Sequence, residues 1–212
     1  MDSFHKFSMI RSIIFDLGNV LVNVEYERFR NKLFKHNVTK ETYDNFFLNG
    51  NYRLLGYEAG EISTDEFIKR CVSGLDLKMS ENEFAHAFND MFSEIRPMSE
   101  IVRKLASEGS FNLFLLSNTS PLHFEHAKDE FDYINLFHKF GLSYELKSLK
   151  PEKEIYERAI KHFGINPIET VFIDDLKENC LQAENFGIKT INYDKSHHID
   201  FLVEFEKIIY NS

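Results

Sequence analysis

Three short apolar runs, each followed at once by polar residues, set the strongest constraint on how this chain can fold. The runs are Ile13-Ile14-Phe15, Phe111 to Leu116 and Val171-Phe172-Ile173, and they end at Asp16, at Ser117 and at Asp174-Asp175. Runs rich in β-branched and aromatic residues and bounded by turn formers are typical of buried strands. The sequence therefore predicts three buried strands with polar residues at their carboxyl ends. Weaker patterns predict two more strands near residues 140–143 and 189–192.

Helical patterns lie between these runs. They cover about residues 98–108, 152–163 and 176–186, and the glycines that follow or end them are Gly109, Gly164 and Gly187. Glycine is a common residue just beyond the end of a helix. Strands that alternate with helices predict an α/β fold with a doubly wound parallel sheet. In such sheets, ligands bind beyond the carboxyl ends of the strands, where the polar residues would converge.

The stretch from residue 25 to residue 96 follows a different pattern. It shows helical periodicity and no convincing strand, and its aromatic residues include Phe29, Phe34, Phe46, Phe47, Phe67, Phe84 and Phe88. The Ser63-Thr64-Asp65-Glu66 segment has the spacing of a capping box, which predicts a helix start after a turn at Gly60. We therefore expect an inserted all-helical cap over residues 25–96, and a core made of residues 9–24 plus 97–212.

Charge and composition exclude several classes of function. The net charge of -9 disfavours binding to polyanions, and we find no basic stripe that would support a nucleic-acid interface. No apolar stretch approaches the roughly 20 residues of a membrane-spanning helix, and the N-terminus lacks a signal-peptide layout. Cys71 and Cys180 lie far apart, which favours buried thiols in a reducing compartment. We expect a cytoplasmic protein.

Carboxylates at two strand ends favour a metal site. Taken alone, Asp16 could equally bond to turn amides, and the Asp174-Asp175 pair could equally cap a helix. Mg²⁺ prefers oxygen ligands and is usually held by one or two carboxylates together with a substrate phosphate. Asp16, a loop carbonyl and Asp174 would supply these ligands. The cation would also let the Asp16 carboxylate approach a phosphate dianion that would otherwise repel it.

Two further segments are candidates for phosphate binding. Ser117 and the backbone amides of Asn118 and Thr119 are expected at a helix N-terminus, where unsatisfied N–H groups and the helix dipole favour an anion. A plain helix cap is the structural alternative. Lys150, just before a predicted helix, could neutralise both Asp16 and a phosphoryl group, whereas a lone loop lysine is usually solvated.

Four motifs stand in order along the chain at strand ends or helix starts. They are Phe15-Asp16-Leu17-Gly18-Asn19-Val20, Ser117-Asn118-Thr119, Lys150-Pro151 and Asp174-Asp175. This series resembles the haloacid dehalogenase superfamily over nearly the whole chain. The insertion at residues 25–96 resembles the helical cap of the first type (C1) found in subfamily I. The Leu-Gly-Asn-Val form of the opening motif is most similar to bacterial α-D-glucose-1-phosphate phosphatases.

The resemblance implies a role for each matching residue. Asp16 would be the nucleophile that forms an aspartyl-phosphate, and Lys150 would be catalytic with it. Asp16, the Gly18 carbonyl and Asp174 would bind Mg²⁺. Asp175 would bind the metal through water or pair with Lys150. The phosphate of the substrate would be bound by Ser117, Asn118 and Lys150.

The implied activity is that of a magnesium-dependent phosphoric monoester hydrolase. Its substrate would be a small phosphorylated metabolite, such as a hexose 1-phosphate, and we expect a monomer or a weak dimer. His123 matches a histidine that follows the second motif in the glucose-phosphatase relatives. An exposed histidine on a helix is the interpretation that we favour for it.

Gly18 departs from the superfamily's usual pattern. Most phosphatases of the superfamily carry a second aspartate at this position, which protonates the leaving oxygen and then activates water. Such a group is typically worth about 10² to 10⁴ in rate. Its absence predicts a slow enzyme, an undemanding leaving group such as the hemiacetal oxygen of a sugar 1-phosphate, or a substitute acid such as Glu25 or Glu58. Loop residues near 49–61 are expected to set specificity.

Two other functions stay open on the sequence. A 2-haloacid dehalogenase also lacks the second aspartate, but it has no use for magnesium or for the Asp174-Asp175 pair. A catalytically degenerate member of the fold would keep the pocket and only bind a metabolite or a protein, and Gly18 supports this alternative.

Overall fold

A five-stranded parallel sheet forms the centre of the computed structural model, which describes residues 9–48 and 56–210. Its strands are β1 (Ser12–Phe15), β4 (Asn112–Ser117), β5 (Lys139–Leu142), β6 (Thr170–Asp174) and β7 (Lys189–Asn192). The strand order is β5-β4-β1-β6-β7, so β1 lies between β4 and β6. The chain moves outward from β1 to β5 and then crosses to β6 on the other side. The carboxyl ends of β1, β4 and β6 therefore flank the point where the strand order reverses, which is where ligands bind in such sheets.

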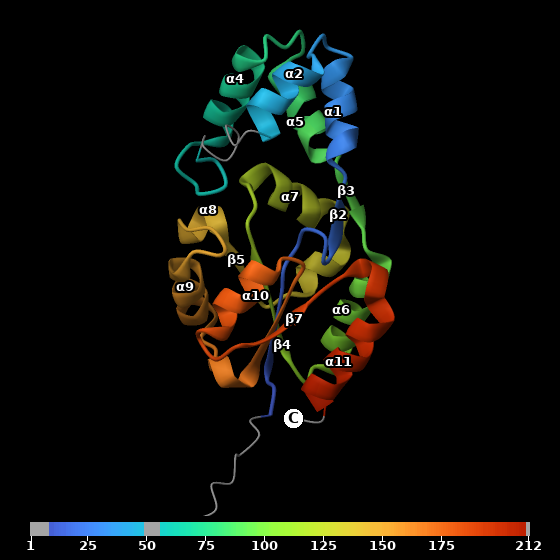
Figure 1. The fold of residues 1–212 in the computed structure, drawn as a ribbon, viewed down its shortest axis with the longest axis vertical. Helices are drawn as coiled ribbons and strands as arrows, with labels where there is room; N and C mark the ends of the chain where they lie inside the picture. The colour runs from blue at the N-terminus through green and yellow to red at the C-terminus, as the bar shows by residue number, and fades with distance from the viewer. Residues whose placement is uncertain (1–8, 49–55, 211–212) are drawn as a thin grey trace, which may run out of the picture.

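Helices cover both faces of this sheet (Figure 1). One face packs against α6 (Arg96–Glu108), α7 (Pro121–Glu130) and α11 (His198–Tyr210), and the other packs against α9 (Lys153–Phe163) and α10 (Lys177–Glu184). The residues of β1 alternate between the two layers, since Ile13 and Phe15 join the first cluster and Ile14 joins the second. The predicted doubly wound α/β fold is confirmed.

The ends of the sheet-covering helices agree with the sequence in two cases and differ in one. Gly109 and Gly164 follow α6 and α9 in the left-handed conformation, as their positions predict. In contrast, α10 ends at Glu184 with Asn185 as a right-handed C-cap, and Gly187 lies further along in the loop. The helix therefore ends two residues before the approximate end that the sequence predicts.

The helices between β2 (Val22–Val24) and β3 (Phe92–Glu94) form a separate group at the top of Figure 1. They are α1 (Tyr26–Phe34), α2 (Lys40–Tyr43), the π-helix η1 (Asp44–Leu48), α4 (Thr64–Gly74) and α5 (Glu81–Asn89). Their buried side chains make an apolar cluster distinct from the two clusters at the sheet. The aromatic residues at its centre include Phe29, Phe67, Phe84 and Phe88. Among the described residues, no helix is long and apolar enough to cross a membrane.

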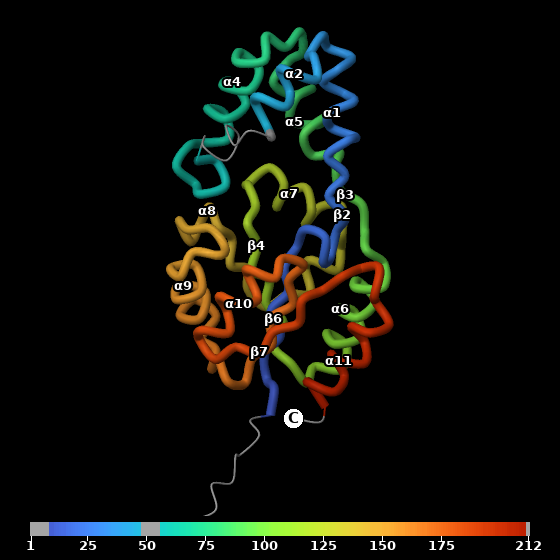
Figure 2. Tube along the Cα trace, in the orientation of Figure 1, coloured from blue at the N-terminus to red at the C-terminus, as the bar shows by residue number. Residues whose placement is uncertain are grey.

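A two-stranded antiparallel ribbon joins this helical group to the sheet, as the tube in Figure 2 shows. It consists of β2 (Val22–Val24) and β3 (Phe92–Glu94). The expectation that residues 25–96 contain no strand is therefore wrong. β3 has only three residues, and its partner lies about 70 positions earlier in the chain, so no local alternation marks it.

The capping residues of the helical group also differ from expectation in part. Ser63 accepts a hydrogen bond from the Glu66 amide at the start of α4, so the predicted helix start is confirmed. The Glu66 carboxylate, however, pairs with Arg70 at 2.7 Å and does not reach back to Ser63. A complete capping box stands instead at the start of α5, between Ser80 and Glu83.

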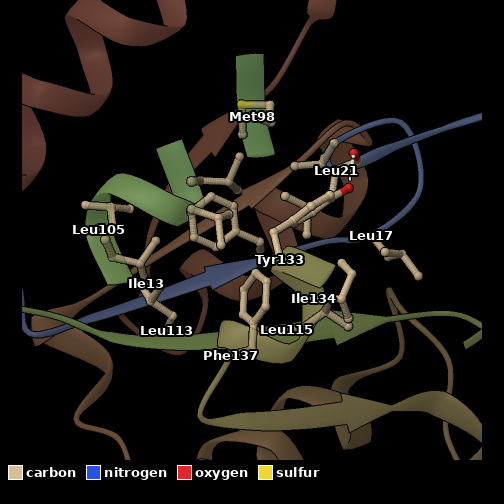
Figure 3. Packing of buried hydrophobic residues seen from close by; sticks show 14 of the residues in the cluster. Ile13, Leu17, Leu21, Met98, Leu105, Leu113, Leu115, Tyr133, Ile134 and Phe137 are labelled. Carbon is tan, nitrogen blue, oxygen red and sulfur yellow. Dashed lines mark hydrogen bonds between the residues drawn. The ribbon is translucent and has the colours of Figure 1, made fainter. Parts of the chain in front are cut away.

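Tyr133 holds the loop that follows β1 in place through a hydrogen bond to Leu21 (Figure 3). It lies in the 3-10 turn η2 (Asp132–Leu136), is fully buried, and donates its hydroxyl to the Leu21 carbonyl at 2.8 Å. Leu21 is also fully buried. This hydrogen bond fixes the chain five residues after Asp16, where it turns from the sheet toward β2.

Tyr133→Phe should lower the free energy of unfolding by about 0.5–1.5 kcal/mol, because it removes a buried hydrogen bond to the Leu21 carbonyl, which keeps the Ile95 amide as its other partner. Urea denaturation measures the change. The matched control is Tyr210→Phe, whose hydroxyl bonds to Glu108 at the surface, where such changes usually stay within about 0.5 kcal/mol. Equal stabilities of the two variants would contradict an anchoring role for Tyr133.

Candidate active site

Three carboxylates meet at the carboxyl ends of β1 and β6. Asp16 follows β1 directly, Asp174 ends β6, and Asp175 comes next. Because Phe15 pairs with Ile173 in register, the residues after them lie side by side. Each aspartate offers a carboxylate oxygen, and these atoms all lie within 4.8 Å of one another. Asp16 and Asp174 are buried, and Asp175 is half-buried.

Lys150 joins two of these carboxylates through its buried ammonium group. Its Nζ atom lies 2.8 Å from Asp16 Oδ1 and 2.6 Å from Asp174 Oδ2, and it also donates to the Leu116 carbonyl at 3.1 Å. Burial alone would lower the pKa of Lys150, but Asp16 and Asp174 together raise it above its ordinary value. The lysine therefore carries a positive charge inside the site.

Asn118 holds the backbone of Lys150 in place. Its side-chain oxygen accepts from the Lys150 amide at 2.7 Å, and its side-chain nitrogen donates to the Lys150 carbonyl at 2.9 Å. Asn118 follows β4, so this pair of bonds ties the lysine loop to the sheet. Both ends of the Asn118 amide group thus serve to position Lys150.

The carboxylates carry more negative charge than one lysine can balance. Burial raises the pKa of Asp16 to about 7, Lys150 opposes this shift, and the charge of Asp174 adds to it. Burial also raises the pKa of Asp175, with a further contribution from Asp174. A buried set of oxygen ligands with excess negative charge fits a hard divalent cation such as Mg²⁺.

Asp174 can still take part in such a set. Its Oδ1 atom accepts from the Leu176 amide and from the Asn179 side chain, both at 2.9 Å, while Oδ2 receives Lys150. A carboxylate offers about four lone-pair positions. One position on Oδ2 therefore remains for a metal ion, and the bonds to Oδ1 fix the orientation of the group.

The expected phosphate loop differs from the sequence prediction in two ways. Ser117 ends β4, but α7 begins only at Pro121, with Ser120 as the N-cap. The segment 117–119 therefore precedes the helix N-terminus and does not form it. In addition, the Thr119 amide already donates to the Ser143 hydroxyl at 3.0 Å, so it is not the phosphate donor that we expected. Proline is common at the first position of a helix, which explains why α7 begins at Pro121 and not at residue 117.

A cavity of 430 Å³ lies between this edge of the sheet and the helical group. Gly18, Ser117 and Asn118 border it on the side of the sheet. Most of its other wall is aromatic, with Tyr26, Phe29, Tyr43, Phe47, Phe88 and Phe92. Glu58 also borders the cavity, whereas Glu25 is not among the described lining residues and pairs with Arg28 at the surface, at 3.2 Å.

The segment that carries Glu58 is tied to the core by three polar contacts. The Tyr57 hydroxyl accepts from the Leu122 amide at 3.2 Å, near the start of α7. The Ser143 hydroxyl lies 2.7 Å from the Glu58 carbonyl, and Lys147 donates to the Gly60 carbonyl at 2.5 Å. Ser143 and Lys147 belong to α8 (Ser143–Leu146) and its C-cap. Of the loop expected to set specificity, residues 49–55 lie outside the described residues.

The expectation of an exposed His123 is wrong. The residue is 7% exposed, borders the cavity, and stacks on Phe88 with ring centroids 4.0 Å apart. Burial lowers its pKa to about 3, so its ring is neutral near neutral pH. Phe88 comes from α5 in the helical group, so only the packing of distant segments reveals the burial of His123.

Sequence reasoning missed several residues that build the site. Asn19 donates to Asp175 at 3.3 Å, and its positive φ of 55° fits its place in the turn after β1. Ser143 and Tyr57 come from segments far apart in the chain and accept from the amides of Thr119 and Leu122, beside the site. The turn position of Asn19 could have suggested its role, whereas no local pattern marks Ser143 or Tyr57.

Comparison with known proteins places this site in a family. A D-ribitol-5-phosphate phosphatase of Bacteroides thetaiotaomicron is 30% identical over 86% of this chain and 91% of its own length. A sesquiterpene phosphatase of Aspergillus oryzae is 27% identical over 62% of this chain and 67% of its own length. A solved structure of a HAD family enzyme of B. thetaiotaomicron, in complex with magnesium and inorganic phosphate, matches with a TM-score of 0.77 and 31% identity, over 90% of this chain and 98% of that one.

None of these relatives is named for glucose 1-phosphate, the substrate that the opening motif had suggested. The sequence also matches a family model described as haloacid dehalogenase-like hydrolase over residues 13–193. With the fold, the relatives and this match in agreement, the chain belongs to the haloacid dehalogenase-like hydrolase family.

Proposed function

We propose that this protein is a magnesium-dependent phosphatase that hydrolyses a small phosphorylated metabolite through an aspartyl-phosphate on Asp16. One observation carries the proposal: a buried lysine bridges two of three clustered carboxylates at the reversal point of the sheet. Dehalogenation would need no such cluster. The names of the relatives support phosphate ester hydrolysis, because two of them are phosphatases.

The proposed chemistry follows from the positions of these residues. An ionised Asp16 oxygen attacks phosphorus, the bond from phosphorus to the ester oxygen breaks, and the leaving oxygen takes up a proton. Water then cleaves the acyl phosphate and regenerates Asp16. Lys150 keeps its charge beside Asp16 Oδ1 and offsets the negative charge of the phosphoryl group.

The metal-binding residues in this proposal are Asp16, the Gly18 carbonyl, Asp174 and Asp175. When bound, Mg²⁺ supplies positive charge that lets a carboxylate and a phosphate dianion come together. The excess negative charge of the carboxylate cluster supports this assignment. Ser117 and the backbone of Asn118, which border the cavity, are the proposed phosphate contacts.

Glu58 is the substitute acid that we propose for the missing second aspartate. The backbone at Gly18 is closely packed, because the Cβ atom of any side chain placed there would lie 3.3 Å from Val24 Cγ2. Glu58 borders the same cavity as Gly18 and Ser117, and its backbone is held by Ser143. The surface pairing of Glu25 with Arg28 makes it the weaker of the two candidates.

The proposed substrate is a sugar or polyol phosphate, with a hexose 1-phosphate as the specific candidate. The replacement of the second aspartate by Gly18 favours a leaving oxygen that needs little protonation, as in a sugar 1-phosphate. The ribitol-phosphate relative supports the wider class of polyhydroxylated phosphates. Residues 25–96 would act as a cap of the C1 type over this substrate, on a core of residues 9–24 plus 97–212.

A catalytically degenerate binding protein is the second candidate, and the glycine at position 18 favours it. It would keep the cavity and the lysine bridge but would release no phosphate. Turnover therefore separates the two functions.

Asp16→Asn should abolish magnesium-dependent phosphate release, because an amide oxygen is a poor nucleophile and a weaker ligand for the cation. Phosphate release from sugar and polyol phosphates, with Mg²⁺ and after chelation, measures the effect. The control is Asp200→Asn, at an exposed position on α11. Release that survives both chelation and Asp16→Asn would rule out the proposed mechanism.

Glu58→Gln should lower kcat by about 10² to 10⁴ for sugar 6-phosphates and polyol phosphates, because it removes the proton donor for their poor alkoxide leaving group, and by less for hexose 1-phosphates. Hydrolysis of p-nitrophenyl phosphate, whose leaving group needs no acid, should change little. The matched control is Glu25→Gln. If Glu58→Gln leaves turnover of both kinds of ester unchanged, Glu58 is not the acid.

Hexose 1-phosphates should be hydrolysed faster than the corresponding 6-phosphates, because a hemiacetal oxygen leaves more readily than an alkoxide. Comparison of kcat/KM for the two isomers of one hexose tests this expectation. Equal values, or a preference for the 6-phosphate, would be inconsistent with a hemiacetal leaving group.

A further inference from the structure

His123 carries a buried polar atom that the proposed chemistry leaves unused. Within residues 9–48 and 56–210, five buried side-chain atoms lack a hydrogen-bond partner: Arg30 Nε, Asp44 Oδ1, Asn89 Oδ1, His123 Nε2 and Asn179 Oδ1. Of these five residues, His123 is the one that borders the cavity above Ser117 and Gly18. The ring therefore borders the place where a substrate would bind.

The hydrogen-bonding state of the ring follows from its surroundings. Burial lowers the pKa of His123 to about 3, so the imidazole is neutral and has one donor and one acceptor nitrogen. The backbone of Phe88 also favours the protonated ring, as a carbonyl oxygen near a ring N–H does. Because Nε2 has no partner, we assign the ring N–H to Nδ1, which leaves Nε2 as the acceptor.

The ring is also held in a fixed orientation. One face stacks on Phe88 at 4.0 Å with an interplanar angle of 25°, and Phe92 packs edge-on at 4.9 Å and 86°. Phe88 and Phe92 come from α5 and β3, whereas His123 comes from α7. The acceptor is therefore positioned jointly by the helical group and by the core.

A hydrogen-bond donor such as a hydroxyl group fits this acceptor, whereas an anionic oxygen does not. A lone acceptor in a buried, largely aromatic wall is costly unless a donor reaches it, and a carboxylate or phosphate oxygen cannot donate. The neighbouring rings would contact the C–H faces of the same molecule. A carbon skeleton with a hydroxyl group meets both requirements, whereas a purely apolar alcohol meets only the second.

We propose that His123 is a specificity-determining residue whose Nε2 atom accepts a hydrogen bond from a hydroxyl group on the alcohol part of the substrate. This inference rests on the proposed function, and it assigns the residue that would recognise a hydroxyl group of the sugar or polyol phosphate. His123 exchanges no proton in the reaction and binds only the part of the substrate that leaves.

The test compares two kinds of ester in the protein with Mg²⁺. His123→Phe keeps the aromatic packing and removes the acceptor, and it should lower kcat/KM for a sugar or alditol phosphate by about 10- to 100-fold. The value for p-nitrophenyl phosphate, which has no hydroxyl group on its alcohol part, should change by less than about threefold. His123→Gln, which restores an acceptor, should recover part of the loss. The control is His126→Phe on the same helix, because His126 borders a different cavity.

The outcomes separate the inference from the proposed function. Selective loss for the hydroxyl-bearing ester, with partial rescue by His123→Gln, supports the hydroxyl contact. Equal losses for both esters in His123→Phe and in His123→Gln, or no loss for either ester, would overturn it while the phosphatase activity of the wild type stands. Absence of phosphate release from both esters in the wild type would instead contradict the proposed function, and the inference with it.

Discussion

The buried ion pairs of Lys150 with Asp16 and Asp174 are the interaction on which the rest of the site depends. A buried charge is costly, and removal of one partner leaves the other charges uncompensated. Several contacts offset this cost. The Leu116 carbonyl accepts a hydrogen bond from the ammonium group, and Asn118 holds the backbone of Lys150. The paired ends of β1 and β6 hold the two carboxylates beside the ammonium group. The reactive groups are thus arranged before any ligand arrives, as electrostatic catalysis requires.

The helical group completes the site from the opposite side. Its aromatic cluster supplies most of one wall of the cavity, and Tyr57, Glu58 and Gly60 bond to the amino-terminal part of α7 and to the α8 region of the core. These contacts place Glu58 and the ring of His123 at the same cavity. In a cavity wall that is mostly aromatic, the few polar atoms fix the orientation of the substrate and determine specificity.

Local sequence patterns were sufficient for the sheet and for the carboxylate ends of its strands. Buried strands are marked by their own composition, and Gly109 and Gly164 are marked by the positive φ that a helix end demands. Asp16 and Asp174 lie together because parallel strands bring their carboxyl ends to one edge, and the loop of Lys150 is tied to that edge by Asn118.

The remaining features depend on contacts between distant segments. β3 exists because it pairs with β2, His123 is buried because α5 packs over α7, and the Thr119 amide is taken by Ser143 from another loop. No window of neighbouring residues contains these relations. The same is true of Asn118, whose side chain turns out to serve Lys150, 32 positions later.

The most direct test of the central claim is a crystal structure of the protein with Mg²⁺ and beryllium fluoride, a mimic of a bound phosphoryl group. The account predicts beryllium fluoride bonded to a carboxylate oxygen of Asp16, with the Lys150 ammonium beside it and the metal ion between Asp16 and Asp174. An unmodified Asp16 at saturating beryllium fluoride and magnesium would contradict its role as the nucleophile.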